Sequence, residues 1–176
     1  MTDQLVTQVQ ELWDKQAIRE VIWRYCRGID RCDLEIMRST YHPDSIDIHG
    51  SFEGTGWGWC EYIVELLPTR WDFTYHTIPN LLIEIENDTA SCESYVLAYQ
   101  AQTVDGKRIM HTFWGRYIDR VERREGEWKI AHRTAVCDWT EEGAQITSRV
   151  LPPDTYVLGK RNRSDLSYSS STKEVL

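Results

Sequence analysis

The sequence predicts an α+β domain in which a curved antiparallel sheet packs on three N-terminal helices. Up to about residue 67, apolar residues recur at three- and four-residue steps, which is the period of a helix. From about residue 71 onward, apolar and polar residues alternate in four long segments, which is the period of a strand. A block of helices followed by a block of consecutive strands is typical of an α+β fold.

The first helix is predicted over residues 3–29, because a polar N-cap precedes it and Gly28 lies near its end. Its predicted buried face consists of apolar residues at helical spacing: Val6, Val9, Trp13, Ile18, Val21, Ile22, Tyr25, Cys26 and Ile29. A short second helix is predicted over residues 33–41, because Pro43 prevents its continuation. These two helices lead directly into the first strand.

That brief strand is predicted over residues 45–49, followed by a Gly-rich turn over residues 50–58. The third helix is predicted over residues 59–67 and ends at Pro68. The four sheet segments are then predicted over residues 71–86, 90–103, 107–123 and 127–139. Turn-forming pairs separate them: Asn87-Asp88, Asp105-Gly106 and Glu125-Gly126. Short turns between consecutive strands predict an antiparallel meander.

Residues 1–140 are predicted to form one domain, and residues 141–176 a C-terminal tail. The tail is polar, contains Pro152-Pro153 and ends in Ser- and Tyr-rich sequence. This composition indicates a segment that is partly disordered, or a flap over the pocket or over a neighbouring subunit.

Composition and charge exclude several classes of function. The 176 residues carry a formal net charge of -8 and the pI is about 5.1, so nucleic acids and anionic membranes would repel the protein. The five cysteines form no C-x-x-C pair, and no two His or carboxylates fall at ligand spacing on one element, so no metal is expected. Neither a signal peptide nor an apolar run of membrane-spanning length is visible, and a cytoplasmic location is expected.

Asp30 and His76 are the candidate catalytic residues. Asp30 comes at the end of the first helix, and His76 lies about 46 residues later in an aromatic, β-prone segment. A carboxylate that holds an imidazole in one tautomer makes that imidazole a competent base near neutral pH. No cofactor signature is visible, so we expect no cofactor and assign the proton transfers to this pair.

The alternation of the strands predicts which side chains accompany this pair. We expect the face that carries His76, Ile78 and Asn80 to meet Asp30 in a cavity. Two other strand faces are candidates to line it: His111, Phe113, Gly115 and Tyr117 on one strand, and Ala131, Arg133, Ala135 and Cys137 on the next. Arg133 offers planar donors that suit an oxyanion, with an ion pair as the alternative.

Four motifs carry a resemblance to a known family: Tyr25-x-x-Gly28-Ile29-Asp30-Arg31-x-Asp33, Tyr41-His42-Pro43-Asp44, His76-x-x-x-Asn80, and the run from Gly115 to Ile130 that contains Trp128. With the order of helices and strands, they resemble the SnoaL-like branch of the nuclear transport factor 2-like superfamily over roughly residues 10–140. The resemblance implies a cone, in which the curved sheet is closed on one side by the helices around a deep apolar pocket.

The resemblance also implies roles for individual residues. Enzymes of this superfamily carry an aspartate after the first long helix and a base histidine on the first long strand, and these match Asp30 and His76. A tyrosine five residues before the aspartate matches Tyr25, whose alternative is a core aromatic. An arginine on the last strand matches Arg133.

We therefore predict a cofactor-independent lyase or isomerase acting on a hydrophobic, hydroxylated substrate. Eight Trp and nine Tyr favour an aromatic or polycyclic ligand. His76 removes a proton and Tyr25 donates to the departing oxygen, while substrate-binding residues orient the ligand: Arg133, Tyr99, Tyr117 and His111. Elimination of water fits this apparatus, as does retro-aldol loss of formaldehyde from a lignin-type diarylpropane. His42 and His49 are assigned to turns and caps, with the cavity mouth as the alternative for His49.

Two other classes remain open. The first is a non-catalytic ligand-binding or structural subunit, like the β-subunits of ring-hydroxylating dioxygenases, which share this fold. The second is a peptide-binding adaptor of the transport-factor type. Turnover of an aromatic alcohol by the protein alone would discriminate the enzyme from both. Relatives commonly form dimers or trimers, so a homodimer or homotrimer is expected.

Overall fold

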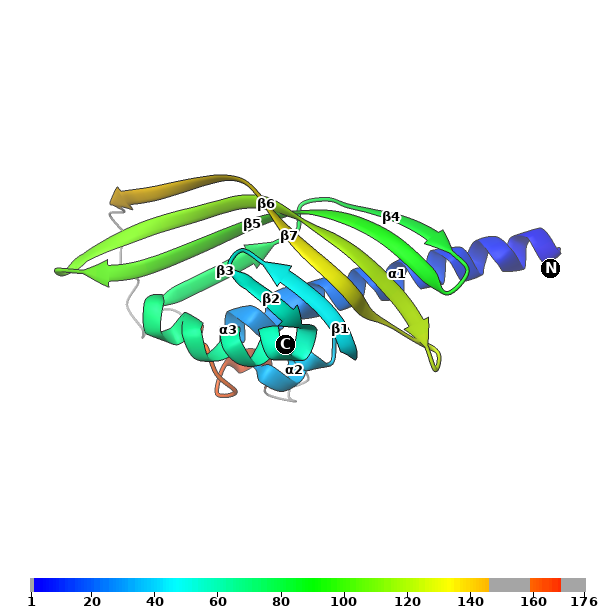
Figure 1. The fold of residues 1–176 in the computed structure, drawn as a ribbon, viewed down its shortest axis with the longest axis horizontal. Helices are drawn as coiled ribbons and strands as arrows, with labels where there is room; N and C mark the ends of the chain where they lie inside the picture. Colours follow the sequence, from blue (N-terminus) through cyan, green and yellow to red (C-terminus); the bar gives the residue numbers. More distant parts are fainter. Residues whose placement is uncertain (1, 146–158, 169–176) are drawn as a thin grey trace.

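The computed structural model describes residues 2–145 and 159–168. The elements follow in this order: α1 (Asp3–Arg31), α2 (Leu34–Arg38), β1 (Tyr41–His49), β2 (Phe52–Thr55), α3 (Gly56–Arg70), β3 (Phe73–Thr77), β4 (Leu81–Glu86), β5 (Thr89–Val104), β6 (Lys107–Arg124), β7 (Glu127–Gln145) and the 3-10 helix η1 (Leu166–Tyr168). Three helices and a large curved sheet confirm the predicted α+β class (Figure 1).

The strands form one sheet in the order β2-β1-β7-β6-β5-β3, and β4 also pairs with β5. The neighbours from β3 and β4 through β5 and β6 to β7 are antiparallel, as the turn signals predict. In contrast, β1 runs parallel to β7, so the sheet is mixed. A parallel pair needs a long connection, and here α3 and five strands lie between the two partners in the chain.

The segment predicted as one strand over residues 71–86 is two strands, β3 and β4, because the chain leaves the ladder at residues 78–80. Pro79 lies in this break and has no backbone N–H to donate to a partner strand. Both strands pair with β5, and His76 lies opposite Ala98. The side chains of His76 and Ala98 therefore lie on the same face of the sheet.

Side-chain caps explain where the helices begin and end. α1 ends at Cys32, which adopts a left-handed φ of 50°, and the Asp33 carboxylate then accepts a backbone N–H from the first turn of α2. α3 begins at Gly56, earlier than predicted, because Thr55 caps it. It continues past Pro68, which lies in the last turn. Residues 50–58, predicted as a turn, therefore hold β2 and the start of α3.

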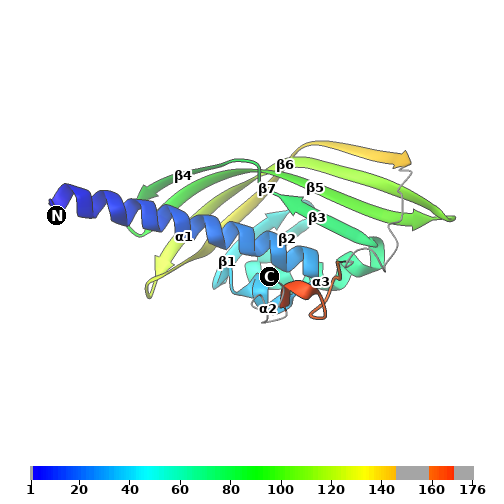
Figure 2. The same ribbon diagram turned by 180° about the vertical axis from the view of Figure 1, so that it is seen from behind.

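The helices lie on the concave side of the sheet, and α1 runs from near the middle of the sheet to beyond the end that carries β4 (Figures 1 and 2). The core fills the space between them, and its most deeply buried apolar side chains are Ile18, Ile22, Tyr25, Met37, Val96, Tyr117, Val121 and Ile130. Gly28 allows α1 to approach α2 closely, because a Cβ there would lie 2.7 Å from Cγ of Met37. The core thus lies between α1 on one side and the sheet on the other.

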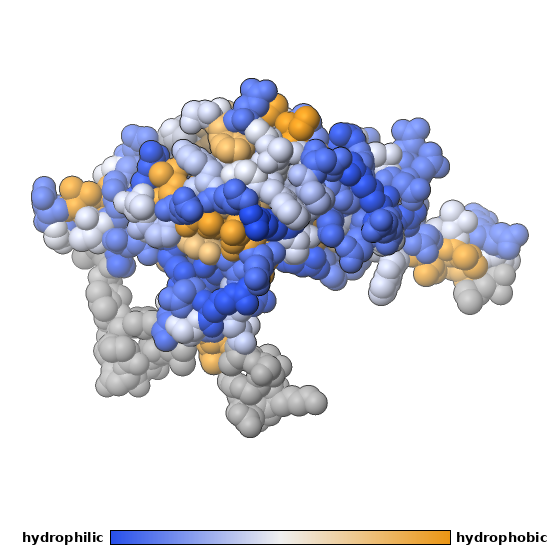
Figure 3. All heavy atoms as spheres, turned by 60° about the horizontal axis from the view of Figure 1, so that its bottom comes forward, coloured by the Kyte–Doolittle hydropathy of each residue, from blue (hydrophilic) through white to orange (hydrophobic). Residues whose placement is uncertain are grey.

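The N-terminal turns of α1 project beyond the sheet (Figure 1), and their apolar atoms are visible at the right of Figure 3. The exposed apolar residues of this end are Leu5, Val6, Val9, Leu12 and Trp13. The predicted buried face is therefore wrong before about residue 14, because no strand lies beneath those turns. It is correct from Ile18 to Ile29.

Residues 159–168 pack against the C-terminal end of α1. The Tyr168 hydroxyl donates to Asp33 Oδ2 at 2.9 Å, and Nη1 of Arg161 donates to the Trp71 carbonyl oxygen at 2.5 Å. These residues belong to the predicted tail, and β7 also continues beyond the predicted boundary. The rest of that tail, residues 146–158 and 169–176, lies outside the described residues. Within the described part of the chain, no helix is long and apolar enough to cross a membrane.

Candidate active site

Asp30 and His76 are in direct contact. Nδ1 of His76 lies 2.7 Å from Oδ1 of Asp30, and the backbone N–H of His76 donates to Oδ2 at 2.9 Å. The last turn of α1 brings the carboxylate to β3, which carries the imidazole. Both side chains are less than 10% exposed, at 6% and 8%. Because Nδ1 faces the carboxylate, it carries the ring proton, and Nε2 on the opposite edge is left with a lone pair.

His76 lies between two hollows. An outer hollow of about 300 Å³ opens between α1 and β3 and is lined by Trp23, Cys26, Arg27, Asp30, Arg31, Tyr75, His76, Thr77 and Ile78. An inner cavity of about 160 Å³ lies within the cone and is lined by Ile29, His49, Trp59, Ile63, Leu67, His76, Ala98, Gln100, Phe113 and Tyr117. Most inner walls are apolar or aromatic, so the imidazole of His76 is among the few polar groups there.

Tyr25 lies behind the wall of this cavity. Its side chain is fully buried, and its hydroxyl oxygen accepts a hydrogen bond from Trp59 Nε1 at 3.0 Å. Its ring makes edge contacts with Tyr41 and Tyr117, at centroid distances of 5.9 and 5.7 Å. Burial raises the pKa of Tyr25, so the phenol stays protonated. Tyr25 is not among the residues that line the cavity, since Trp59 and Tyr117 stand in front of it.

Arg133 is fully buried and makes an ion pair with Asp119, which lies directly opposite it on β6. Its Nε and Nη2 atoms each donate to this carboxylate at 2.7 Å. The guanidinium also lies 4.3 and 4.1 Å from the ring centroids of Tyr25 and Tyr117. Two of its three nitrogens are therefore bound within the protein, and the aromatic rings separate it from the cavity lining.

The other predicted substrate-binding residues have different positions. Tyr117 lines the inner cavity. Tyr99 lies opposite Tyr75 in the β3–β5 ladder, on the other face from the cavity residue Ala98. His111 lies farther along β6, where Nε2 is 3.1 Å from Nε2 of Gln102. The structure thus brings His76, which Asp30 contacts from outside, and Tyr117 to one cavity, and it does not bring Tyr99 or His111 to that cavity.

Sequence reasoning missed a second imidazole–carboxylate pair. His49 lines the inner cavity, and its Nδ1 lies 3.3 Å from Oδ1 of Asp47. Both residues lie on β1 two positions apart, so they share one face of the strand. This Asp-x-His spacing is the signal that would have found them. Gln100 on β5 is a further cavity residue that alternation with Ala98 would have predicted.

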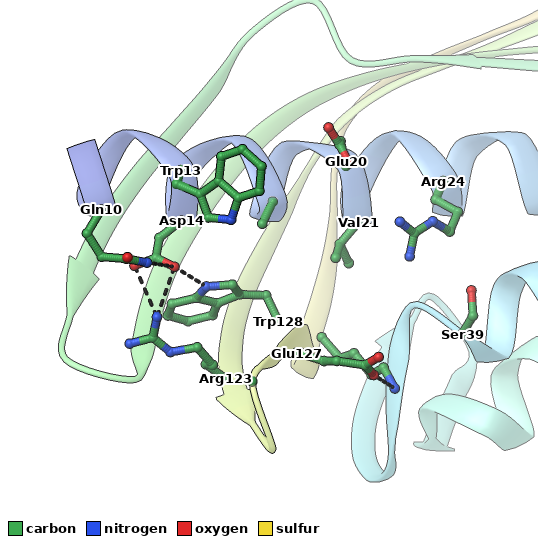
Figure 4. A pocket seen from close by; sticks show the side chains of 13 residues that line it. Gln10, Trp13, Asp14, Glu20, Val21, Arg24, Ser39, Arg123, Glu127 and Trp128 are labelled. Carbon is green, nitrogen blue, oxygen red and sulfur yellow. Dashed lines mark hydrogen bonds and ion pairs between the residues drawn. The ribbon is translucent and has the colours of Figure 1, made fainter.

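A separate groove of about 650 Å³ lies at the outer part of α1, beside the β6–β7 turn. Figure 4 shows Asp14 at one end of this groove, beside Gln10, where the carboxylate accepts hydrogen bonds from Arg123 and from Nε1 of Trp128. The shortest of these are 2.9 Å, and Arg123 also pairs with Asp88. The carboxylate is saturated by these donors, so this groove offers no free base comparable to His76.

Among residues 2–145 and 159–168, no three His, Cys, Asp or Glu side chains are grouped closely enough to hold a metal ion. The inner cavity thus presents acid–base groups of the chain itself, namely His76 and His49 with their carboxylates.

Comparison with known proteins places the chain in a family. The profile of the SnoaL-like domain matches residues 10–134, and the chain belongs to this family. The fold resembles a hexachlorocyclohexane dehydrochlorinase, LinA type 2, with a TM-score of 0.71 and 20% identity over 83% of this chain and 98% of that one. LinA type 3 from Novosphingobium barchaimii LL02 gives a TM-score of 0.69 and 20% identity over 83% and 99% of the two chains.

A candidate scytalone dehydratase from Novosphingobium aromaticivorans is similar to the same extent. Its TM-score is 0.69, with 23% identity over 82% of this chain and 99% of that chain. No curated protein matches this chain in sequence. These likenesses establish the cone fold of the nuclear transport factor 2-like superfamily, as the sequence motifs predict.

Proposed function

We propose that this protein is a cofactor-independent lyase or isomerase that begins its reaction with proton removal by His76. The observation that carries the proposal is the contact between Nδ1 of His76 and Asp30, which leaves Nε2 as the base on a residue that lines the inner cavity. Asp30 stabilises the imidazolium that forms when Nε2 takes the proton. A positioned base of this kind contributes about 10²- to 10⁴-fold to the rate.

The proposed substrate is hydrophobic and hydroxylated, and it carries an aromatic ring. Apolar and aromatic walls favour a ring, since they include Phe113, Trp59 and Ile63. The cavity measures about 160 Å³. A larger ligand fits only if these side chains move or if part of the ligand lies in the outer hollow. Tyr117 is the phenol at the cavity wall, so it takes the role of donor to substrate oxygen. Tyr25 and Arg133 support that wall from behind.

Two reactions use these groups without an oxidant or reductant. In elimination, Nε2 takes a proton from carbon, the C–H electron pair forms the double bond, and the hydroxyl leaves as water with the proton that Nε2 then gives up. In retro-aldol cleavage, Nε2 takes a hydroxyl proton and the C–O bond becomes the carbonyl of formaldehyde. The electron pair of the broken C–C bond stays on carbon, which then takes up the proton. Both steps return His76 to its neutral form.

The test is a turnover screen with a matched pair of variants. Purified protein is incubated with hydroxylated aromatic alcohols, including a lignin-type diarylpropane diol, without added metal, flavin or nicotinamide, and products are followed by NMR. We expect conversion by the wild type and at least a 10²-fold loss in His76→Gln. His132→Gln is the control, because His132 lies on β7 outside the cavity and should keep full activity.

Two outcomes would overturn the proposal. Equal turnover by wild type and His76→Gln would remove His76 from the mechanism. No turnover of any alcohol, with ligand binding intact, would favour the non-catalytic ligand-binding class instead.

A further inference from the structure

The second imidazole of the cavity, His49, lies beside a buried carboxylate without a hydrogen bond to it, since Nδ1 of His49 and Oδ1 of Asp47 are both buried and have no hydrogen-bond partner within the described residues. Its Nδ1 lies 3.3 Å from Oδ1 of Asp47, a fully buried carboxylate. The other oxygen of Asp47 accepts the Tyr41 hydroxyl hydrogen bond at 2.6 Å. The ring of His49 stacks on Trp59, with centroids 4.0 Å apart and planes 10° from parallel. These contacts fix the ring plane and direct Nδ1 toward the carboxylate, so Nε2 faces away from Asp47.

His49 is neutral at physiological pH. Burial lowers the pKa of His49, and the positive charge of Arg133 adds to this effect, while Asp47 opposes it. In the neutral ring, a lone pair on Nδ1 would be repelled by the Asp47 carboxylate 3.3 Å away, so we assign the ring proton to Nδ1 and leave Nε2 as a hydrogen-bond acceptor. The cavity is therefore lined by two imidazoles, His49 and His76, and in each ring Nδ1 lies beside a carboxylate, so that Nε2 is on the opposite edge.

The size of the cavity limits what can occupy it. A cavity of roughly 150 Å³ with apolar walls accommodates one benzene ring, and this cavity measures about 160 Å³. Its remaining walls come mainly from apolar residues: Ile29, Ile63, Leu67, Ala98 and Phe113. A ligand buried here must supply a donor to each imidazole acceptor, because a buried acceptor left without a hydrogen bond is unfavourable.

We propose that His49 is a second substrate-binding residue, and that the cavity takes a single six-membered ring with two hydroxyl groups, one donating to Nε2 of each imidazole. This inference rests on the proposed function, because both use His76. It narrows the substrate to a dihydroxylated ring. The stacked pair of Trp59 and His49 supplies one flat wall for that ring.

Binding of simple rings tests this inference without any turnover. The probes are the three dihydroxybenzene isomers, phenol with one donor, and 1,2-dimethoxybenzene with none, and affinities come from calorimetry. We expect at least one dihydroxybenzene to bind the wild type about tenfold more tightly than phenol, as one additional hydrogen bond provides. In His49→Phe, which keeps an aromatic ring against Trp59, this advantage should disappear while phenol affinity is retained. His132→Phe is the control.

A second measurement on the wild type avoids any folding defect of the variant. The ¹⁵N resonance of His49 Nε2 should move when the tightest dihydroxybenzene binds and stay in place with 1,2-dimethoxybenzene. An unmoved resonance, or a dihydroxybenzene advantage that persists in His49→Phe, would overturn the inference. Tight binding at both imidazoles with no turnover in the alcohol screen would instead sustain this inference and contradict the proposed function.

Discussion

The two imidazole–carboxylate pairs of the cavity differ in how their carboxylates are anchored. Asp30 receives Nδ1 of His76 on one oxygen and the backbone N–H of the same residue on the other. Asp47 receives the Tyr41 hydroxyl on one oxygen and lies 3.3 Å from Nδ1 of His49 with the other. A backbone N–H can only donate, whereas a hydroxyl can rotate and also accept. The direction of the hydrogen bonds in the Asp30 pair is therefore fixed. In the Asp47 pair, the Tyr41 hydroxyl can change from donor to acceptor.

The largest expected effect is that of Asp30→Asn. The asparagine oxygen must accept from the backbone N–H of His76, so the amide NH₂ group turns toward Nδ1. This forces the ring proton onto Nε2, and the base is lost. We expect turnover of any substrate found in the alcohol screen to fall about 10³-fold, as wrong-tautomer variants of catalytic histidines do. Turnover within threefold of wild type would show that Asp30 does not set the tautomer.

The next effect concerns the free energy of unfolding and the packing around the Asp47 pair. A Cβ on Gly56 would lie 2.3 Å from Oγ of Ser45 and 2.4 Å from Cδ1 of Tyr41, the residue that holds Asp47. We expect Gly56→Ala to lower the free energy of unfolding by about 1 to 3 kcal/mol, as overpacking does. Urea denaturation measures this change. Gly54→Ala is the control, because the three atoms nearest to its Cβ would be side-chain ring carbons of Phe52, at 3.0 Å or more.

A smaller effect concerns pH. The pKa of His49 is lowered by burial, so the unfolded chain binds a proton that the folded protein does not. Stability is therefore complete above pH 6.5 and declines below it. This decline reaches at most about 1.4 kcal/mol at pH 5.5 for one histidine.

His42 contributes in the same direction, because burial also lowers its pKa. We expect His49→Phe to lose less stability than the wild type between pH 7.5 and 5.5, as measured by urea denaturation at both values. An equal decline in the two proteins would mean that His49 is protonated in the folded state.

The smallest effect is that of Asp47→Asn. The Tyr41 hydroxyl can rotate to accept from the new NH₂ group, so the amide oxygen stays toward His49 and the tautomer is kept. Affinity for the dihydroxybenzenes should then change by less than about threefold. A tenfold loss, comparable to that expected for His49→Phe, would show that the charge of Asp47 is needed and that the two pairs behave alike.

The contact of Asp30 with His76 was predictable because both residues lie at element ends that the fold and the family motifs define. The start of α1 and the antiparallel ladders β4–β5, β5–β6 and β6–β7 followed from period and turn chemistry. The parallel pairing of β1 with β7 was not predictable, since no local signal in the short segment of β1 names a partner more than 80 residues away.

The roles of the remaining residues depended on register. Tyr99 lies on the face opposite the cavity because His76 pairs with Ala98, and a shift of one residue would have reversed this. Arg133 does face inward as alternation predicts, but the cross-strand neighbour Asp119 binds it. Such a partner is evident only when the ladder is known. His49 was accessible from sequence, because Asp47 lies two positions before it on one strand.

The central claim is that Asp30 leaves Nε2 of His76 as a free base, and ¹⁵N NMR of the histidine rings tests it most directly. In the wild-type protein at pH 8, the account predicts that Nδ1 of His76 carries a proton and that Nε2 does not. In Asp30→Asn it predicts the reverse. A proton on Nε2 of His76 in the wild type would contradict the account.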